Sequence, residues 1–184
     1  MARKLDQIIV VDLEATCWSG EPPIGEESEI IEIGLCLLDL ASEERLDNRA
    51  LLVKPQRSKI SPYCEELTTL TQSQVDAGIS FEEACQVLIR EYNSRNRTWA
   101  SYGDYDRIQL QAQCQAWGVD YPFGRSHINI KNLLALQLKL KREVGLPAAM
   151  DLLGMSLEGT LHRGIDDAWN IAAVLGRVLY PHAG

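Results

Sequence analysis

The sequence predicts an α/β fold in which helices flank a mixed central sheet. Three apolar stretches rich in β-branched residues come first, at 7–16, 29–40 and 49–54, with short connections between the last two. Consecutive strands of this kind favour an antiparallel meander. After residue 60 helical patterns alternate with short strands, which is typical of parallel strands with helices on the faces of the sheet.

Capping signals and apolar periodicity place the later elements. Ser61 followed by Pro62, and Ser80 followed three residues later by Glu83, are N-terminal helix signals, and the second pair predicts a capping box. Gly118 ends a later helix. We expect a short helix followed by a turn within 61–71, and helices from 80 onward and over 104–117, 132–141, 147–153 and 165–179. Short strands are expected at 97–102 and 127–130.

Length and composition favour a single globular domain over residues 1–184. The hydrophobic content is 46%, yet no apolar run approaches a membrane span. The basic N-terminus is interrupted by Asp6 and Gln7, so we expect no signal peptide. Five scattered cysteines without a CxxC pair predict free thiols in a reducing cytosol, and hence a cytoplasmic protein.

Charge is distributed unevenly along the chain. The net charge of −8 argues against binding nucleic acid by bulk electrostatics. Residues 12–47 contain eleven acidic side chains and one basic, whereas residues 121–144 contain five basic and one acidic. An acidic half that binds metal and a basic flank that meets phosphate is one interpretation, and ordinary solvated faces are the other.

Two carboxylates follow the first apolar run. Asp12 and Glu14 stand one residue apart after Ile8–Val11, and alternate residues of a strand point to one face. Two like charges at the end of a buried strand repel each other and lose hydration, which a cation between them would relieve. Such oxygen ligands suit Mg²⁺ or Mn²⁺. A solvated acidic turn is the alternative.

A third carboxylate begins the last helix. Asp167 is followed at steps of four, seven and eleven by Ile171, Val174 and Val178, which form an apolar row. Its neighbour Asp166 heads a mostly polar row. We therefore expect Asp167 to face the core, where a carboxylate needs a partner.

A fourth carboxylate begins the helix at 104–117. Asp106 heads the row Leu110, Cys114 and Trp117, whereas Asp104 suits an N-cap position. The contrast is weaker here because other apolar residues form a partial second stripe. For either helix, an aspartate that stabilises the helix dipole is the alternative.

His162 is the histidine nearest to one of these aspartates. It precedes Asp167 by five residues, with Gly164 between them, which indicates a loop entering the helix. Four carboxylates and a histidine suit a hydrolytic site with two divalent cations. A histidine with an ordinary pKa can accept the proton of the attacking water. This chemistry fits phosphodiester hydrolysis; His127 and His182 receive no role.

Three motifs, in chain order, resemble those of the DEDDh 3′–5′ exonucleases of the ribonuclease-H-like superfamily. They are VVDLEAT, SYGDYDR and HRGIDDA, which contain the D-x-E pair, an aromatic–Asp pair and H-x-x-x-x-D. The phrases DLEATCW, SEIIEIG and ELTTLTQSQVD are most similar to the Eri-type branch, whose members trim RNA 3′ ends. The resemblance covers about 7–179 and implies a ribonuclease-H-like mixed sheet.

Carried over by position, the resemblance implies that Asp12, Glu14, Asp106 and Asp167 bind two divalent ions, Mg²⁺ or Mn²⁺. It implies that His162 is the general base.

The resemblance also implies contacts with the substrate. Glu14 and His162 would touch it, Leu70 would pack on the 3′-terminal nucleotide, and Ala15 and Thr16 would lie beside its sugar and base. Ordinary loop packing is an alternative for Thr16. Apolar packing on a base tolerates any sequence.

The sequence therefore predicts a 3′–5′ exonuclease that acts on 3′ ends of single-stranded RNA, or also DNA, and releases nucleoside 5′-monophosphates. A catalytically silent binding module with this fold is one alternative, although all five ionisable residues are present. A phosphatase of the haloacid-dehalogenase kind is another, suggested by DLEAT, but Glu14 replaces its second aspartate. We expect no membrane partner. The protein partner and the choice between monomer and homodimer stay open.

Overall fold

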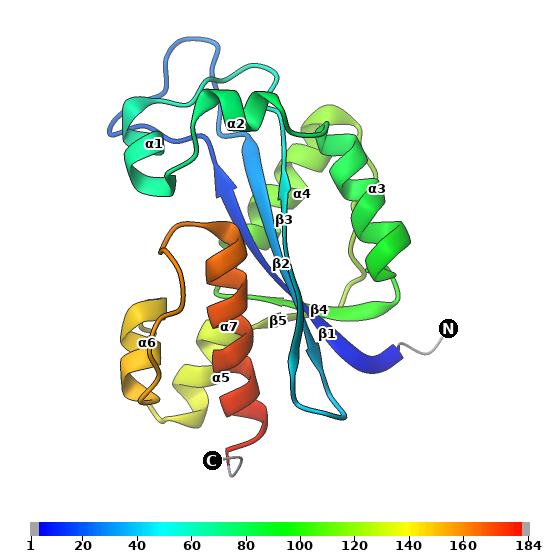
Figure 1. Cartoon of the computed structure of the whole chain (residues 1–184), viewed down its shortest axis with the longest axis vertical. Helices are drawn as coiled ribbons and strands as arrows, with labels where there is room; N and C mark the ends of the chain where they lie inside the picture. The colour runs from blue at the N-terminus through cyan, green and yellow to red at the C-terminus, as the bar shows by residue number, and fades with distance from the viewer. Residues whose placement is uncertain (1–3, 182–184) are drawn as a thin grey trace.

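The computed structural model describes residues 4–181, and its centre is a five-stranded sheet in the order β3–β2–β1–β4–β5 (Figure 1). β1 (Lys4–Ala15), β2 (Ile30–Asp39) and β3 (Arg45–Leu52) pair antiparallel in succession. β4 (Arg97–Ser101) pairs parallel with β1, and β5 (His127–Asn129) pairs parallel with β4. The predicted mixed sheet, with a meander and parallel strands, is confirmed.

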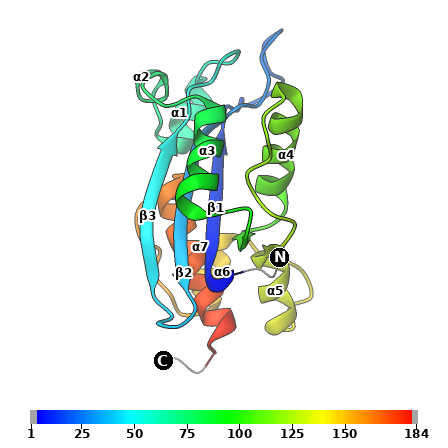
Figure 2. The ribbon, with the colours of Figure 1, turned by 90° about the vertical axis from the view of Figure 1, so that its right-hand side faces the viewer.

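Helices cover both faces of this sheet (Figure 2). α3 and α4 pack on one face, and α5, α6 and α7 pack on the other. Between Lys4 and Pro181 no helix combines the length and apolar character that crossing a bilayer requires. The helices are α1 (Pro62–Thr68), α2 (Gln72–Asp76), α3 (Phe81–Tyr92), α4 (Tyr105–Trp117), α5 (Ile130–Gln137), α6 (Leu146–Leu152) and α7 (Gly164–Leu179).

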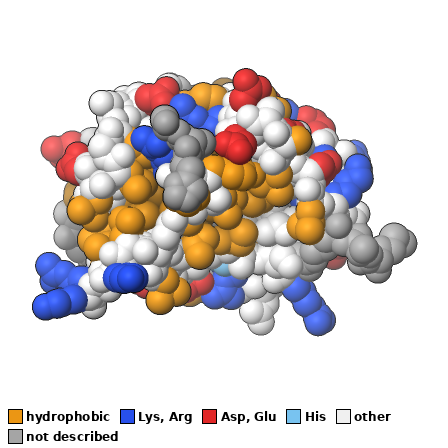
Figure 3. Space-filling model, turned by 90° about the horizontal axis from the view of Figure 1, so that it is seen from below, with side chains coloured by type: hydrophobic (Ala, Val, Ile, Leu, Met, Phe, Trp, Pro, Cys, Tyr) orange, Lys and Arg blue, Asp and Glu red, His pale blue; other side chains and the backbone are white. Residues whose placement is uncertain are grey.

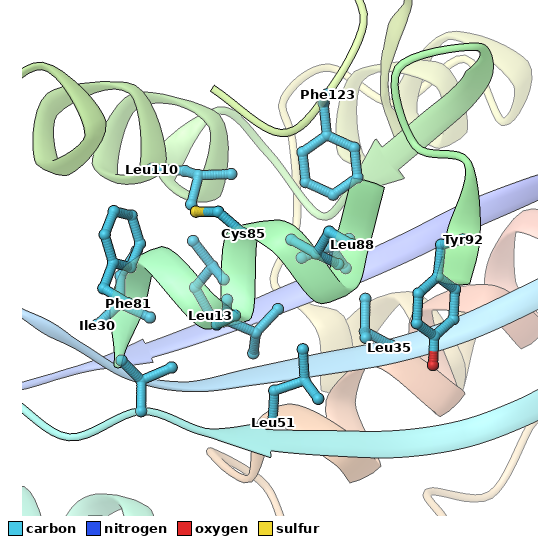
Figure 4. Packing of buried hydrophobic residues seen from close by; sticks show 14 of the residues in the cluster. Leu13, Ile30, Leu35, Leu51, Phe81, Cys85, Leu88, Tyr92, Leu110 and Phe123 are labelled. Atoms are coloured by element: carbon cyan, nitrogen blue, oxygen red, sulfur yellow. The ribbon is translucent and has the colours of Figure 1, made fainter. Parts of the chain in front are cut away.

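Side chains of β1 alternate between the two layers. Ile9 and Val11 are fully buried in the core shared with α3 and α4, where Leu88 of α3 belongs to the same cluster as Leu13 and Leu35 of the strands (Figure 4). Ile8 and Val10 lie in the other core, shared with α5, α6 and α7. Asp12 and Glu14 have the same parity as Ile8 and Val10, so they leave the sheet on the α7 side.

α7 approaches the backbone of β2 through two glycines. A Cβ on Gly34 would lie 1.8 Å from the carbonyl oxygen of Gly164, so only glycine fits at position 34 without moving the helix. The N-terminus of α7 therefore sits directly on the sheet beside the end of β1. This contact places the first turn of α7, including Asp167, near Asp12 and Glu14.

Two predicted elements, β3 and α5, had wrong boundaries. β3 begins at Arg45 and not at residue 49, because the Asp39 carboxylate accepts bonds from the amides of Ala41 and Ser42 and closes the hairpin early. α5 begins at Ile130 and ends at Gln137, not at 132–141. Asn129 caps it by accepting a bond from the Asn132 amide, so β5 ends at Asn129.

α2 was not predicted. Thr71 and Gln74 form its reciprocal capping box. The box expected at Ser80 and Glu83 is only half formed among the described residues: the Ser80 hydroxyl accepts a bond from the Glu83 amide. A five-residue helix is too short to show apolar periodicity, which is why it was missed.

Candidate active site

A cavity of about 460 Å³ lies at the C-terminal end of β1. It opens between α1, the N-termini of α4 and α6, and the loop before α7. All five ionisable residues predicted to form the catalytic site line it: Asp12, Glu14, Asp106, His162 and Asp167.

Asp12 and Glu14 reach the cavity from β1. Asp12 is half-buried and Glu14 is buried. Burial, and then the charge of Asp106, raise the pKa of Asp12 well above its ordinary value. Burial, and then the charges of Asp167 and Glu32, raise the pKa of Glu14 to about 8. The charged forms of these two carboxyl groups are therefore unfavourable in the cavity, as expected for carboxylates that lie close together with no cation between them.

Asp106 enters from the first turn of α4. Its Oδ1 accepts a hydrogen bond of 3.0 Å from the amide of Leu13, which ties the helix to β1. Burial raises the pKa of Asp106 to about 6, although the bond from Leu13 favours the charged form. Asp104, in contrast, is exposed and is the N-cap residue of α4, as expected, although its side chain makes no capping bond. Its carboxylate accepts bonds from Arg107 and Asn129 instead.

Asp167 enters from the first turn of α7 and is buried. Its Oδ2 accepts a bond of 2.8 Å from the amide of His162, while its Oδ1 is buried and has no partner among the described residues. Burial raises the pKa of Asp167. The neighbouring Asp166 points elsewhere and accepts a bond from the amide of Thr160. The apolar-row argument thus selected the aspartate that faces the cavity.

His162 lies on the loop before α7 and is exposed. Its backbone adopts a left-handed conformation with φ of 60°, which the bond from its amide to Asp167 supports. One ligand atom from each of Glu14, His162 and Asp167 lies within 4.8 Å of the others. A histidine nitrogen, several carboxylate oxygens and one unpartnered buried oxygen form a donor set that fits a divalent cation.

Glu32 and Arg163 support this loop, and we did not predict either from the sequence. Glu32 is fully buried on β2, opposite Glu14. It accepts a bond of 2.7 Å from the amide of Gly164 and pairs with the Arg163 guanidinium at 3.2 Å. The signal was present, because a charged residue within the apolar run IIEIG requires a buried partner.

The apolar wall of the cavity differs from expectation. Leu67 of α1 lines it, together with Ala15 and the half-exposed residue Tyr105. Leu70 is fully buried in a separate cluster with Ile31, because the chain turns inward after α1 ends at Thr68.

Thr16 packs inside the protein and not against the cavity. It is fully buried, and its hydroxyl accepts a bond from the Glu29 amide and donates one to the Glu27 carbonyl. This is the loop packing that was the alternative for Thr16. His127 bonds to Ser101 beneath the sheet end, and His182 lies outside the described residues.

Comparisons with known proteins agree with this geometry. The RNase_T family model, described as an exonuclease, matches residues 9–175. The chain is similar to human 3′-5′ exoribonuclease 1, at 33% identity over 95% of this chain and 52% of that protein. It is also similar to the Drosophila melanogaster 3′-5′ exonuclease Snipper, at 28% identity over 94% of this chain and 69% of that protein. The chain thus spans about half the length of the first of these relatives.

Solved structures show the same likeness. The nuclease domain of 3′hExo, a DEDDh family member bound to rAMP, superposes with a TM-score of 0.88 at 32% identity, covering 96% of this chain and 93% of that one. A 3′-exonuclease solved for 3′-end recognition of a histone mRNA stem-loop superposes with a TM-score of 0.85 at 30% identity, covering 99% and 84%. The ribonuclease-H-like architecture is therefore confirmed. Together with the family match and the three motifs, these likenesses show that the chain belongs to the RNase_T exonuclease family, in its DEDDh 3′–5′, Eri-type branch.

Proposed function

We propose that this chain is a metal-dependent 3′–5′ exonuclease that removes nucleoside 5′-monophosphates from the 3′ end of single-stranded RNA, or also of single-stranded DNA. One observation carries the proposal: the buried, unpartnered Oδ1 of Asp167 lies in a cavity whose other acidic groups have raised pKa values. Such a site is unfavourable until cations bind. Residues 1–184 would act as one exonuclease domain.

The four carboxylates would hold two divalent cations, Mg²⁺ or Mn²⁺. The family uses divalent ions, and the donors here are oxygens that such hard cations prefer. When bound, the cations would neutralise charge on the phosphate and acidify the attacking water. The ligands would be Asp12, Glu14, Asp106 and Asp167.

His162 would accept the proton of the attacking water. Its ring is exposed to the cavity mouth, where water has access, while its backbone is held by Asp167. Histidine is suited to this role because its ordinary pKa lies near neutrality. The imidazole would return the proton to solvent after each cycle.

Leu67, Ala15 and Tyr105 would hold the terminal nucleotide. Leu67 and Ala15 offer apolar surface, and the Tyr105 ring is 56% exposed and free to stack on a base. These contacts do not read base edges, so we expect little sequence preference. RNA is proposed as the main substrate because the human relative is named an exoribonuclease and the 3′hExo domain was solved with rAMP.

The enzyme would work in the cytoplasm, as its cysteines suggest. All five are free thiols, and four of them are buried. Thiols in this state are typical of reducing compartments.

A gel assay tests the proposal. RNA and DNA oligonucleotides labelled at the 5′ end would be incubated with the protein and Mn²⁺, with EDTA, and with the Asp167→Asn variant. We expect shortening from the 3′ end that EDTA and the variant abolish. Asp151→Asn, an exposed carboxylate of α6, serves as the matched control and should keep full activity. Intact oligonucleotides with both Mg²⁺ and Mn²⁺ would contradict the proposal and favour a binding module.

A further inference from the structure

We propose that a basic groove beside the cavity binds the phosphate backbone of the RNA strand behind its terminal nucleotide. The groove lies between α5 and the connection that follows it, and we define it by Lys131, Asn132, Leu136, Lys139, Lys141 and Arg142. This inference rests on the proposed function, because it names the path by which that substrate reaches the site.

Three of the four positive charges of the groove lack an acidic partner, and the fourth, Lys131, pairs with Glu143. Lys139, Lys141 and Arg142 are exposed, and none of them forms an ion pair within residues 4–181. Elsewhere most arginines are paired, as Arg97 is with Asp6 and Arg45 with Glu158. Three unpaired cations within four residues repel one another, and an anion would relieve that repulsion.

The groove begins at the rim of the cavity. Gly145, Leu146 and Pro147 line the cavity directly after the basic segment. The Tyr102 hydroxyl, which also lines the cavity, donates a bond of 2.9 Å to the carbonyl of Val144. Three residues span at most about 11 Å, so Arg142 lies within that distance of Gly145.

The connection then runs back along α5. Lys131, at the start of the helix, lies 3.8 Å from Glu143, at the end of the connection, whereas Lys139 lies just beyond the far end. Eight residues of helix correspond to about 12 Å. That length matches roughly three stacked nucleotides, so the groove can follow the strand away from the site.

The shape and surface of the groove suit single-stranded nucleic acid. A hollow of about 400 Å³ lies between its two sides, and its lining includes Leu136, Leu140, Lys139 and Arg142, with Glu143 as its one acidic residue. Leu136 is 77% exposed, and basic side chains stand beside exposed hydrophobic surface on the lower face of the molecule (Figure 3). Cations for phosphates with apolar surface for bases are the features that hold single strands without sequence preference.

The cavity itself cannot supply this attraction. Its lining contains four carboxylates and no lysine or arginine, and the whole chain carries a net charge of −8. Phosphates that lie outside the cavity therefore need a separate source of positive charge. The groove is placed to provide it.

Binding measurements on a charge-neutralised triple variant test this inference. Lys139→Gln/Lys141→Gln/Arg142→Gln would be made in the Asp167→Asn background, so that RNA stays intact. The control, Lys54→Gln/Lys59→Gln/Arg90→Gln, removes the same charge from exposed positions after β3 and on α3. Affinity for a 5′-labelled ten-nucleotide RNA would be followed by fluorescence anisotropy with Mg²⁺ at several salt concentrations.

We expect the groove variant to bind at least tenfold more weakly at about 0.05 M salt. The slope of the logarithm of its binding constant against the logarithm of the salt concentration should fall in magnitude by about 2, since each phosphate contact to a single strand contributes about 0.7. The control triple should change affinity less than twofold because distant charges are screened. The single variant Arg142→Gln should lower the same slope by about 0.7. It tests the proposal independently in case the triple variant does not fold. The groove proposal would be contradicted if the two triple variants lowered RNA affinity equally, or if the salt dependence of binding did not change in the groove variant.

A dinucleotide separates this proposal from the proposed function. In the active protein, the groove substitutions should raise the KM for the ten-nucleotide RNA. They should leave the KM for a dinucleotide unchanged, because a dinucleotide is too short to reach Lys139. If the native protein cleaves neither substrate but the groove variant still loses RNA binding, the exonuclease proposal fails and the groove stands. If the native protein cleaves both RNAs, and the ratio of the KM for the dinucleotide to the KM for the ten-nucleotide RNA is the same in the native protein and in the groove variant, the groove proposal is wrong. The exonuclease proposal is then still supported.

Discussion

The two faces of β1 lie in opposite environments. Toward α3 and α4, Ile9 and Val11 are completely buried among apolar side chains. Toward α7, Ile8 and Val10 are buried in the same way, but the next two positions of that face are Asp12 and Glu14. The active site thus occupies the point where apolar packing on one face stops while packing on the other continues.

One face of β1 therefore contributes to stability, and the other face carries the functional residues. The closed face holds the strand in place through apolar burial, whereas the open face crowds carboxylates whose pKa values are raised. The second arrangement destabilises the metal-free protein and is tolerated because the first compensates for it. Functional sites commonly oppose stability in this way.

The largest expected effect follows from changing the open face. Asp12→Asn should lower kcat by about 10³-fold or more, because it removes a proposed ligand at the reacting phosphate. The metal-free variant should be at least as stable as the native protein, since one of several mutually repelling carboxylates is gone. Single-turnover cleavage and urea unfolding in EDTA measure the two effects. Activity within tenfold of native would contradict the assignment of Asp12.

Changing the closed face should have the opposite consequence. Ile9→Ala should lower the free energy of unfolding by about 2–5 kcal/mol, because it leaves a void in a fully packed core. At a temperature where the variant is folded, kcat should stay within about threefold of native. Urea unfolding and turnover on one preparation check both. A loss of kcat as large as that of Asp12→Asn would show that the two faces are not independent.

Substitution of Glu32, which holds the loop before α7, should have an intermediate effect on activity. Glu32→Gln weakens the bonds to Arg163 and Gly164 and should lower kcat by about 10–100-fold, as losses around metal ligands commonly do. KM should change little, because Glu32 does not line the cavity. Glu158→Gln, which breaks the surface pair with Arg45, is the control and should change kcat less than twofold. Equal losses in the two variants would contradict a positioning role for Glu32.

The smallest expected effect is on stability as a function of pH. Glu14 has its pKa raised from 4.5 to about 8 in the folded protein. A raised carboxyl pKa means that the folded state holds its proton longer than the unfolded state, so the contribution of Glu14 to stability is greatest below about pH 4.5 and declines toward pH 8. Allowing for water in the cavity, we expect a decline of roughly 1–2 kcal/mol from this group. Thermal unfolding in EDTA measures it; Mg²⁺ should restore stability most at pH 8, and a stabilisation with rising pH would contradict the crowded-carboxylate account.

Much of this site could be predicted because its residues obey local periodicity. Strand alternation placed Asp12 and Glu14 on one face, and helical rows selected Asp106 and Asp167 over Asp104 and Asp166. One detail of that argument failed: Asn170, in the polar row of Asp166, is fully buried because its amide bonds to the backbone of Glu158. A polar residue is not always an exposed one.

Residues whose position depends on distant segments could not be predicted from the sequence. Leu70 is two residues past the end of α1, where a left-handed Thr69 redirects the chain, so its side chain joins Ile31 and not the cavity. Glu32 and Arg163 are 131 residues apart. No periodicity relates them.

Local patterns in the sequence were enough to predict the order of the strands and helices other than α2, and the carboxylates that face inward. The sequence also determined the motifs of the exonuclease family, since each of these depends on a spacing of a few residues. Only the tertiary structure decided that the carboxylates and His162 share one cavity, that Leu67 lines it, and that Glu32 holds the loop before α7. The physical reason is that these outcomes depend on long-range packing, above all the contact between Gly34 and Gly164 that seats α7 on the sheet.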